Sequence, residues 1–336
     1  MNLKLLSFDP PKKSRNVVKI IGIGKEGTNI VMYLNELFIC GVELFTCDPD
    51  ETLKSVKPFR KTKNTFMFPI DNNINEWADV NIPFSLTDHV NATREILNNG
   101  SKLLIIIACF QETTDSVYSI NYAKLSRELG ILTLALIGIM GIPTQQQWGP
   151  LLTLDPKQLE QFTDSLLLIN FGILSKFQST SFFNDMKVGS WILAQAAKSI
   201  SELVTVVGYI CMDFEDIRKV MQNSGLCVLG MGTASGHSRA IRATEEALHS
   251  PLLNGYDINE SNDILLYFSS GHEEITMDEI YEVTEFLKKS ATIPRDLLWG
   301  NGFDRTLGDA IRIIIFGTGI NKFYTDRRAT PTISFL

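Results

Sequence analysis

The sequence VVKIIGIGKEGTNIVMYLNELFICGVELFTCD, residues 17–48, decides the fold class. It opens with a continuous apolar run at 17–23, the pattern of a strand that is covered on both faces in a parallel sheet. Apolar residues at helical spacing follow and end at Gly41, and a second apolar run reaches Asp48. Strand, glycine turn, helix and strand predict a βαβ unit of an α/β protein.

Three glycines form a motif between the first strand and the helix. Gly22, Gly24 and Gly27 are spaced as GxGxxG, and glycines at such a turn let a phosphate approach the backbone at a helix N-terminus. Asp48 follows about 20 residues later, where a dinucleotide-binding fold keeps a carboxylate for a ribose hydroxyl. The motif alone leaves two interpretations open, an NAD-binding domain and a tight turn that holds no ligand.

The rest of the chain continues the alternation of strands and helices. Residues 102–109 and 131–139 predict two more buried strands with a helix between them. Residues 184–206 keep apolar residues at helical spacing for about six turns, which predicts one long helix. We therefore expect a Rossmann-like nucleotide-binding lobe at 1–183, a central connecting helix, and a second, smaller α/β lobe at 207–336.

Composition and charge exclude several classes of protein. The formal net charge is −7, so a nucleic-acid partner is not expected, and the basic clusters at 11–15 and 57–63 are interpreted as solvated surface. The first residues lack the features of a secretory signal, and no apolar run is long enough to span a membrane. We expect a cytoplasmic protein.

The cysteines show no metal-binding pattern. No CxxC spacing occurs, and an odd number of cysteines argues against both a disulfide framework and a zinc site. We interpret them as small buried apolar residues and expect no metal centre. They are Cys40, Cys47, Cys109, Cys211 and Cys227.

Two carboxylates lie at the start of the helical pattern at 216–222. Asp213 is placed to cap that helix, and Asp216 falls in its first turn, where negative charge is favourable. A carboxylate pair is also able to orient an attacking water. The structural and the catalytic interpretation both stay open.

Residues 197–253, AKSISELVTVVGYICMDFEDIRKVMQNSGLCVLGMGTASGHSRAIRATEEALHSPLL, closely resemble the FtsZ family of the FtsZ/tubulin superfamily. A helix, the catalytic loop and a GxASGxxRA turn follow one another there in the family's order. The resemblance continues to IRIIIFGTGI at 311–320. Upstream, IIGIGKEGTNIV at 20–31 is similar to the family's first glycine-rich nucleotide turn, and 103–137 keeps the length of its main phosphate-loop segment.

The resemblance implies a GTP-binding N-terminal lobe. It also implies that the loop before the helix at 216–222 completes the GTPase site of the next subunit in a head-to-tail filament. Such an interface is heterologous and does not close, so it produces a polymer. Carried over by position, the nucleotide-binding residues are Gly22, Gly24, Gly27, Asn29, Asp48 and Asp50, and the catalytic carboxylates are Asp213 and Asp216.

The phosphate loop departs from the family pattern. The family's GGGTGTG aligns with seven residues that include no glycine: Gln111, Glu112, Thr113, Thr114, Asp115, Ser116 and Val117. Side chains now fill space that a close phosphate needs, and Glu112 and Asp115 bring negative charge toward it. Further family positions are replaced by Thr144, Trp148, Met186, Ser190 and Cys211.

These departures predict an FtsZ-like assembly protein of cell division or membrane remodelling with lost or weakened GTP binding. Such a pseudo-GTPase needs no cofactor and assembles with itself or with a genuine FtsZ through head-to-tail contacts. Two alternatives remain open. In the first alternative, the chain is an active divergent GTPase that uses GTP with magnesium and polymerises. In the second, more remote alternative, it is an NAD-binding oxidoreductase.

Overall fold

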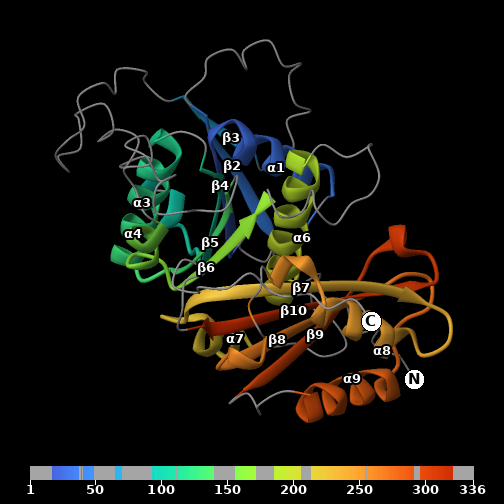
Figure 1. Ribbon diagram of the computed structural model, residues 1–336. Coiled ribbons are helices and arrows are strands. Elements are labelled where there is room, and N and C mark those ends of the chain that lie inside the picture. Colours follow the sequence, from blue (N-terminus) through green and yellow to red (C-terminus); the bar gives the residue numbers. More distant parts are fainter. Residues whose placement is uncertain are drawn as a thin grey trace, which may run out of the picture.

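The computed structural model describes residues 17–37, 39, 41–48, 65–69, 93–94, 96–110, 113–139, 156–171, 185–205, 213–253, 256, 258–290 and 296–320. Figure 1 shows the arrangement of the helices and strands. In the first half they are β1 Val18–Ile23, α1 Gly24–Glu36, β2 Val42–Asp48, β3 Thr65–Pro69, β4 Leu103–Cys109, α3 Thr113–Glu128, β5 Leu132–Ile139, α4 Pro156–Glu160 and β6 Ser165–Asn170. The helix α6 Asp185–Thr205 connects this half to the second half. The second half contains α7 Phe214–Met221, β7 Gly225–Ser235, α8 Arg239–Leu248, β8 Asp263–Ser270, α9 Met277–Ser290, β9 Leu297–Phe303 and β10 Ala310–Ile320, with short 3-10 turns at Pro251–Leu253, Ile258–Glu260 and Arg305–Leu307.

All strands of the described part join one sheet in the order β3-β2-β1-β4-β5-β6-β7-β10-β8-β9. The neighbours from β3 through β6 are parallel, and β6 also pairs in parallel with the start of β7. Strand β10 is antiparallel to both β7 and β8, and β9 is parallel to β8. In Figure 1 the strands β7 to β10 run across the lower end of the first six. The α/β fold expected from the sequence is confirmed.

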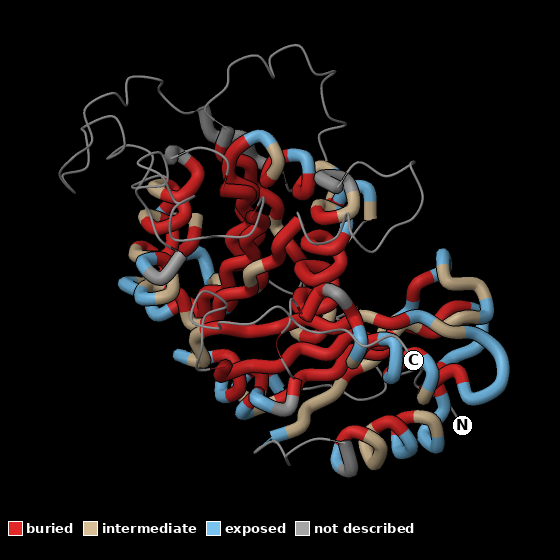
Figure 2. The backbone as a smooth tube through the Cα atoms, in the orientation of Figure 1, coloured by how far each residue is buried: buried red, intermediate tan, exposed pale blue. Residues whose placement is uncertain are grey.

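Helices cover both faces of the parallel part of the sheet. α1 and α6 pack on one face and α3 and α4 on the other. The side chains of β1 alternate between them, with Val18 and Ile20 in the core beneath α1 and α6, and Ile21 and Ile23 in the core beneath α3. Figure 2 shows these strands buried along their length. This burial explains why β1 carries apolar residues on both faces instead of alternating. The exception is the buried Lys19, whose Nζ pairs with Glu43 Oε2 at 2.6 Å.

The predicted long helix is confirmed as α6, which packs against α1, β5 and β9 and so contacts both halves of the chain. The structure contains three strands that we did not predict from the sequence, β3, β6 and β9. β3 ends in a proline and β9 contains two glycines and an asparagine, so neither carries a strong strand pattern. β6, SLLLIN, carries a short apolar run that periodicity alone does not distinguish from a buried helix segment.

Close backbone packing fixes α1 on the sheet. A Cβ on Gly22 would lie 2.2 Å from the carbonyl oxygen of Gly27, and a Cβ on Gly27 would lie 2.6 Å from the carbonyl oxygen of Ile107. Both obstacles are backbone atoms, which do not move aside without shifting the helix or the strand. Gly22 and Gly27 are therefore required by the packing of β1, α1 and β4, whether or not a ligand binds.

A buried network of charged groups ties α6 to the second half. Lys198 Nζ on α6 lies 3.3 Å from Asp304 Oδ2, and Arg312 on β10 lies 3.3 Å from the same oxygen. Glu202, one turn after Lys198, accepts a hydrogen bond from the hydroxyl of Tyr267 on β8. Burial raises the pKa of Glu202, and the nearby charge of Lys198 only partly opposes this. The network places paired charges where α6 meets the second half of the sheet.

We predict that Gly27→Ala lowers the free energy of unfolding by about 1–3 kcal/mol, because the added methyl group overpacks the contact with β4. Helix propensity alone predicts the opposite sign, since alanine favours a helix over glycine by about 1 kcal/mol. Asn29→Ala, on the exposed side of the same helix, is the matched control and should be neutral or slightly stabilising. Urea denaturation measures both changes, and a stabilised Gly27→Ala variant would contradict the packing argument.

We also predict that Lys198→Met lowers the free energy of unfolding by about 3 kcal/mol, because it leaves Asp304 and Glu202 buried with less compensating charge. Lys288→Met is the control. Its ion pair with Glu285 on α9 is solvent-exposed, so its loss should cost less than about 1 kcal/mol. If chemical denaturation gives equal changes in the free energy of unfolding for the two substitutions, the buried network contributes little to stability.

Candidate anion site at the start of α1 and α3

The starts of α1 and α3 meet at one edge of the sheet. β1 runs directly into α1, β4 leads to α3, and the two strands are adjacent and parallel, with Ile23 opposite Ala108. The order β2-β1-β4 reverses the direction in which the chain adds strands, so this edge is a topological switch point. Open α/β sheets bind ligands at such a point, beyond the carboxyl ends of the strands.

The carboxylate of Asp115 occupies the space above Gly24. Gly24, the first residue of α1, has φ +70, and a Cβ there would lie 2.2 Å from Asp115 Oδ1 and 3.2 Å from Oδ2. Asp115 is in the first turn of α3, and only 6% of its surface is exposed. Glycine is thus needed at position 24 for two reasons, the left-handed backbone and the close approach of this carboxylate.

The start of α1 lacks a side-chain cap of its own. Its N-cap residue is Ile23, whose side chain accepts no hydrogen bond, while Glu26 supplies negative charge in the first turn. The first amide groups of a helix need acceptors from elsewhere, and the helix dipole favours an anion near them. Asp115 brings a buried carboxylate to this end of α1.

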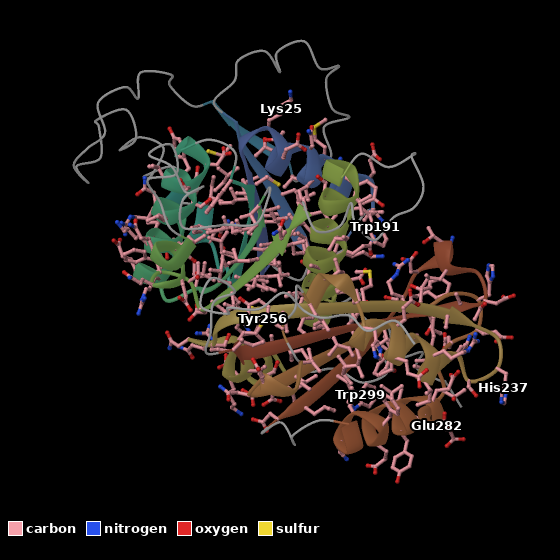
Figure 3. The ribbon with its side chains drawn as sticks, in the orientation of Figure 1. Lys25, Trp191, His237, Tyr256, Glu282 and Trp299 are labelled. Atoms are coloured by element: carbon pink, nitrogen blue, oxygen red, sulfur yellow. The ribbon has the colours of Figure 1, made fainter. Side chains whose placement is uncertain are left out.

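The charge around this site is negative. Burial, followed by the charges of Glu26 and Asp115, raises the pKa of the Cys109 thiol at the end of β4 well above its usual range. Lys25 is exposed, and Figure 3 shows it projecting outward from the start of α1. A neutral buried thiol and two carboxylates therefore surround the place where the sequence predicts phosphate groups.

The other predicted nucleotide residues are spread around this edge. Asn29 is exposed on α1, where its Nδ2 donates to Glu26 Oε2 at 3.5 Å. Asp48 is the last residue of β2, next to β1, and Ser116 is buried in α3. The backbones of Thr113 and Thr114 begin α3. The residues Asp50, Gln111, Glu112, Thr144, Trp148 and Cys211 lie outside the described part, as do the side chains of Asp48, Thr113, Thr114 and Met186.

The predicted catalytic carboxylates are at the start of α7. Asp213 is the N-cap residue, and its Oδ1 accepts a hydrogen bond from the backbone N–H of Glu215 at 3.3 Å. Asp216 in the first turn pairs with Lys219 at 3.0 Å. The capping role of Asp213 is confirmed, and a catalytic role for either residue stays a prediction. Because both lie at the surface, neither is held in a buried hydrogen-bond network.

One chain does not bring the carboxylates and the glycine turn together. Lys25 in Figure 3 marks the upper end of the molecule, while α7 lies in the lower part of the same view in Figure 1. Asp213 and Asp216 therefore cannot act on a ligand held at Gly24 of their own chain.

The GxASGxxRA turn has a structural role. Arg239 begins α8, its side chain is buried, and its Nε donates to Glu279 Oε1 of α9 at 2.8 Å. The same guanidinium donates to the backbone carbonyl of Asp309 at 3.2 Å. This arginine joins α8, α9 and the turn before β10, which accounts for its place in the motif without a ligand.

Among the described residues, no group of three or more His, Cys, Asp or Glu is placed to hold a metal ion. Cys47, Cys109 and Cys227 are buried and unbridged, as expected, whereas Cys40 and Cys211 lie outside the described part. No described helix is long and apolar enough to cross a membrane.

Sequence reasoning placed Asp115 in the phosphate loop but missed its contact with Gly24. It also missed the network of Lys198, Asp304 and Arg312, because nothing in their spacing indicates that they meet. Residues with a strong local pattern were easier to place, as Asp213 before an amphipathic helix shows.

Comparisons with known proteins agree with this architecture. Residues 225–321 match the model of the FtsZ family, C-terminal domain. The cell division protein FtsZ of Buchnera aphidicola from Schizaphis graminum is 29% identical over 97% of this chain and 86% of its own. FtsZ 1 of Pyrococcus furiosus is 24% identical over 94% of this chain and 84% of its own.

Solved structures show the same fold. An empty FtsZ dimer from M. jannaschii superposes with a TM-score of 0.76 at 23% identity, covering 90% of this chain and 88% of that one. CetZ1 from Haloferax volcanii, solved as a GDP-bound monomer, superposes with a TM-score of 0.64 at 12% identity, covering 90% of this chain and 94% of that one. Fold and sequence thus agree along nearly the whole chain: it is similar to FtsZ proteins over more than nine-tenths of its length, and residues 225–321 match the C-terminal domain of the FtsZ family.

Proposed function

We propose that this chain is an FtsZ-like cytoskeletal protein of cell division or membrane remodelling in which GTP binding is lost or weakened. One observation carries the proposal, the buried Asp115 carboxylate against Gly24. In the family pattern that aligned position is a glycine of the phosphate loop. The proposal includes the division of the chain into a former GTP-binding domain at 1–183, a connecting helix at 184–206 and a C-terminal domain at 207–336.

Electrostatics support weak nucleotide binding. Two like charges about 4 Å apart repel by about 4 kcal/mol at an effective dielectric constant near 20. Micromolar affinity corresponds to roughly 8 kcal/mol, so two such contacts are sufficient to abolish it. Asp115 and Glu26 both place carboxylates near the start of α1, whereas Lys25 in the same turn is exposed and projects outward.

Assembly depends on the opposite end of the molecule. We propose that Asp213 and Asp216, exposed and partly exposed at the start of α7, face the nucleotide of a neighbouring subunit. The neighbour is a second copy of this chain or a genuine FtsZ. A contact between two different surfaces does not close on itself, so it extends or terminates a filament.

An active divergent GTPase is the second candidate. The observations in its favour are the retained Gly22, Gly24 and Gly27 turn and the two carboxylates at the start of α7. In that case GTP with magnesium binds at the start of α1 and α3, and Asp115 moves to admit it. Nothing in the described second half resembles a hydride-transfer site, so an NAD-dependent oxidoreductase is not proposed.

We predict that the nucleotide-stripped chain gives no saturable heat with micromolar GTP and magnesium in isothermal calorimetry. The carboxylates at the α1–α3 edge repel the phosphates, and the bare backbone of the family loop is missing. A genuine FtsZ treated in the same way is the control and should bind. Saturable micromolar binding by this chain, with phosphate release that grows with its concentration, would favour the active GTPase instead.

We further predict that this chain alters the GTP turnover and polymer mass of a genuine FtsZ through α7. Asp213→Asn combined with Asp216→Asn should lower at least tenfold any GTP turnover that the chain supports in its neighbour. The reason is that loss of a positioned acid or base slows such a reaction by about 10²–10⁴-fold. Glu215→Gln, exposed on the same helix, is the matched control. If adding the unaltered chain leaves both turnover and sedimented polymer unchanged, co-assembly is excluded.

A further inference from the structure

We infer that Asp115 is the resident anion of the α1–α3 edge, a carboxylate from the chain itself that takes the place of a bound phosphate group. The inference deepens the proposed loss of GTP binding and rests on it. It assigns to this edge a specific chemistry, that of an oxyanion site that is filled within the molecule.

The geometry is the first argument. Both carboxylate oxygens face the first residue of α1, at 2.2 and 3.2 Å from where a Cβ of Gly24 would be, and the side chain is 6% exposed. A phosphate group placed above Gly24 would need the same volume. The two anions therefore exclude each other.

The missing cap of α1 is a second and independent argument. Most helices satisfy their first amides with the side chain of the N-cap residue, and Ile23 has no group to offer. Asp115 reaches α1 from a different helix, in whose own first turn it also lies. One carboxylate is thus placed near the positive ends of two helix dipoles, a position that phosphate groups favour as well.

Two consequences follow. Asp115 stabilises the fold in the absence of a nucleotide. Removal of the side chain uncovers the start of α1 and leaves a hole that accepts a small oxyanion. Loss of the charge alone, with the side-chain volume kept, removes the stabilisation without opening the hole.

These consequences are tested by thermal unfolding of the full chain with and without inorganic diphosphate. Asp115→Asn keeps the volume and removes the charge, and Asp115→Ala removes both. Asp278→Asn and Asp278→Ala are the matched controls, because Asp278 is an exposed aspartate in the first turn of α9. We expect both Asp115 variants to melt about 2–4 °C lower than the corresponding Asp278 variants.

Diphosphate should raise the melting temperature of Asp115→Ala by about 2–4 °C in a saturable way, and should leave the unaltered chain and Asp115→Asn unchanged. Equal stability of the Asp115 and Asp278 variants, or no response of Asp115→Ala to diphosphate, overturns the inference. Should Asp115→Ala fail to fold, the melting temperature of Asp115→Asn tests the inference: it must lie below that of Asp278→Asn, and equal values overturn the inference. The proposed function fails on a different result, GTP binding by the unaltered chain.

Discussion

The close contact of α1 with β1 and β4 is the constraint on which the site depends. Gly22 and Gly27 permit it, because a Cβ at either residue would run into the backbone of Gly27 or Ile107. The contact brings the start of α1 to the sheet edge where α3 also begins. The geometry of an anion site is therefore a by-product of packing. All three glycines in the motif are needed even if no phosphate ever binds, because Gly24 is required by its positive φ and its contact with Asp115.

This separation of packing from binding explains how a GxGxxG motif persists beside a phosphate loop without glycines. Gly24 is the position where the two functions meet, since its positive φ and its contact with Asp115 both forbid a larger side chain. On our inference, a single carboxylate meets the electrostatic demand of both helix ends. The fold then keeps its architecture while the chemistry of the edge changes from binding an anion to supplying one.

The sequence predicts those parts that carry a local signal. Continuous apolar runs identified β1, β4 and β5, helical periodicity identified α6 within one residue at each end, and Asp213 was placed as a cap. β9 was missed because its glycines weaken the strand pattern, and β6 because a short apolar run alone does not distinguish a strand from a buried helix segment. The contact between Asp115 and Gly24 joins residues far apart in sequence, and its existence depends on how two helices converge. No spacing rule contains that information.

The two ends of the molecule are built from different parts of the chain. The α1–α3 edge is built from one half, whereas α7 belongs to the other, and α6 with its buried charges connects them. A defect in anion binding at the first end therefore leaves the surface of α7 intact. On the proposed function, such a subunit presents a competent face to one neighbour and a defective face to the other. In a head-to-tail polymer this asymmetry sets a direction, so the chain would act at one end of a filament and not at both.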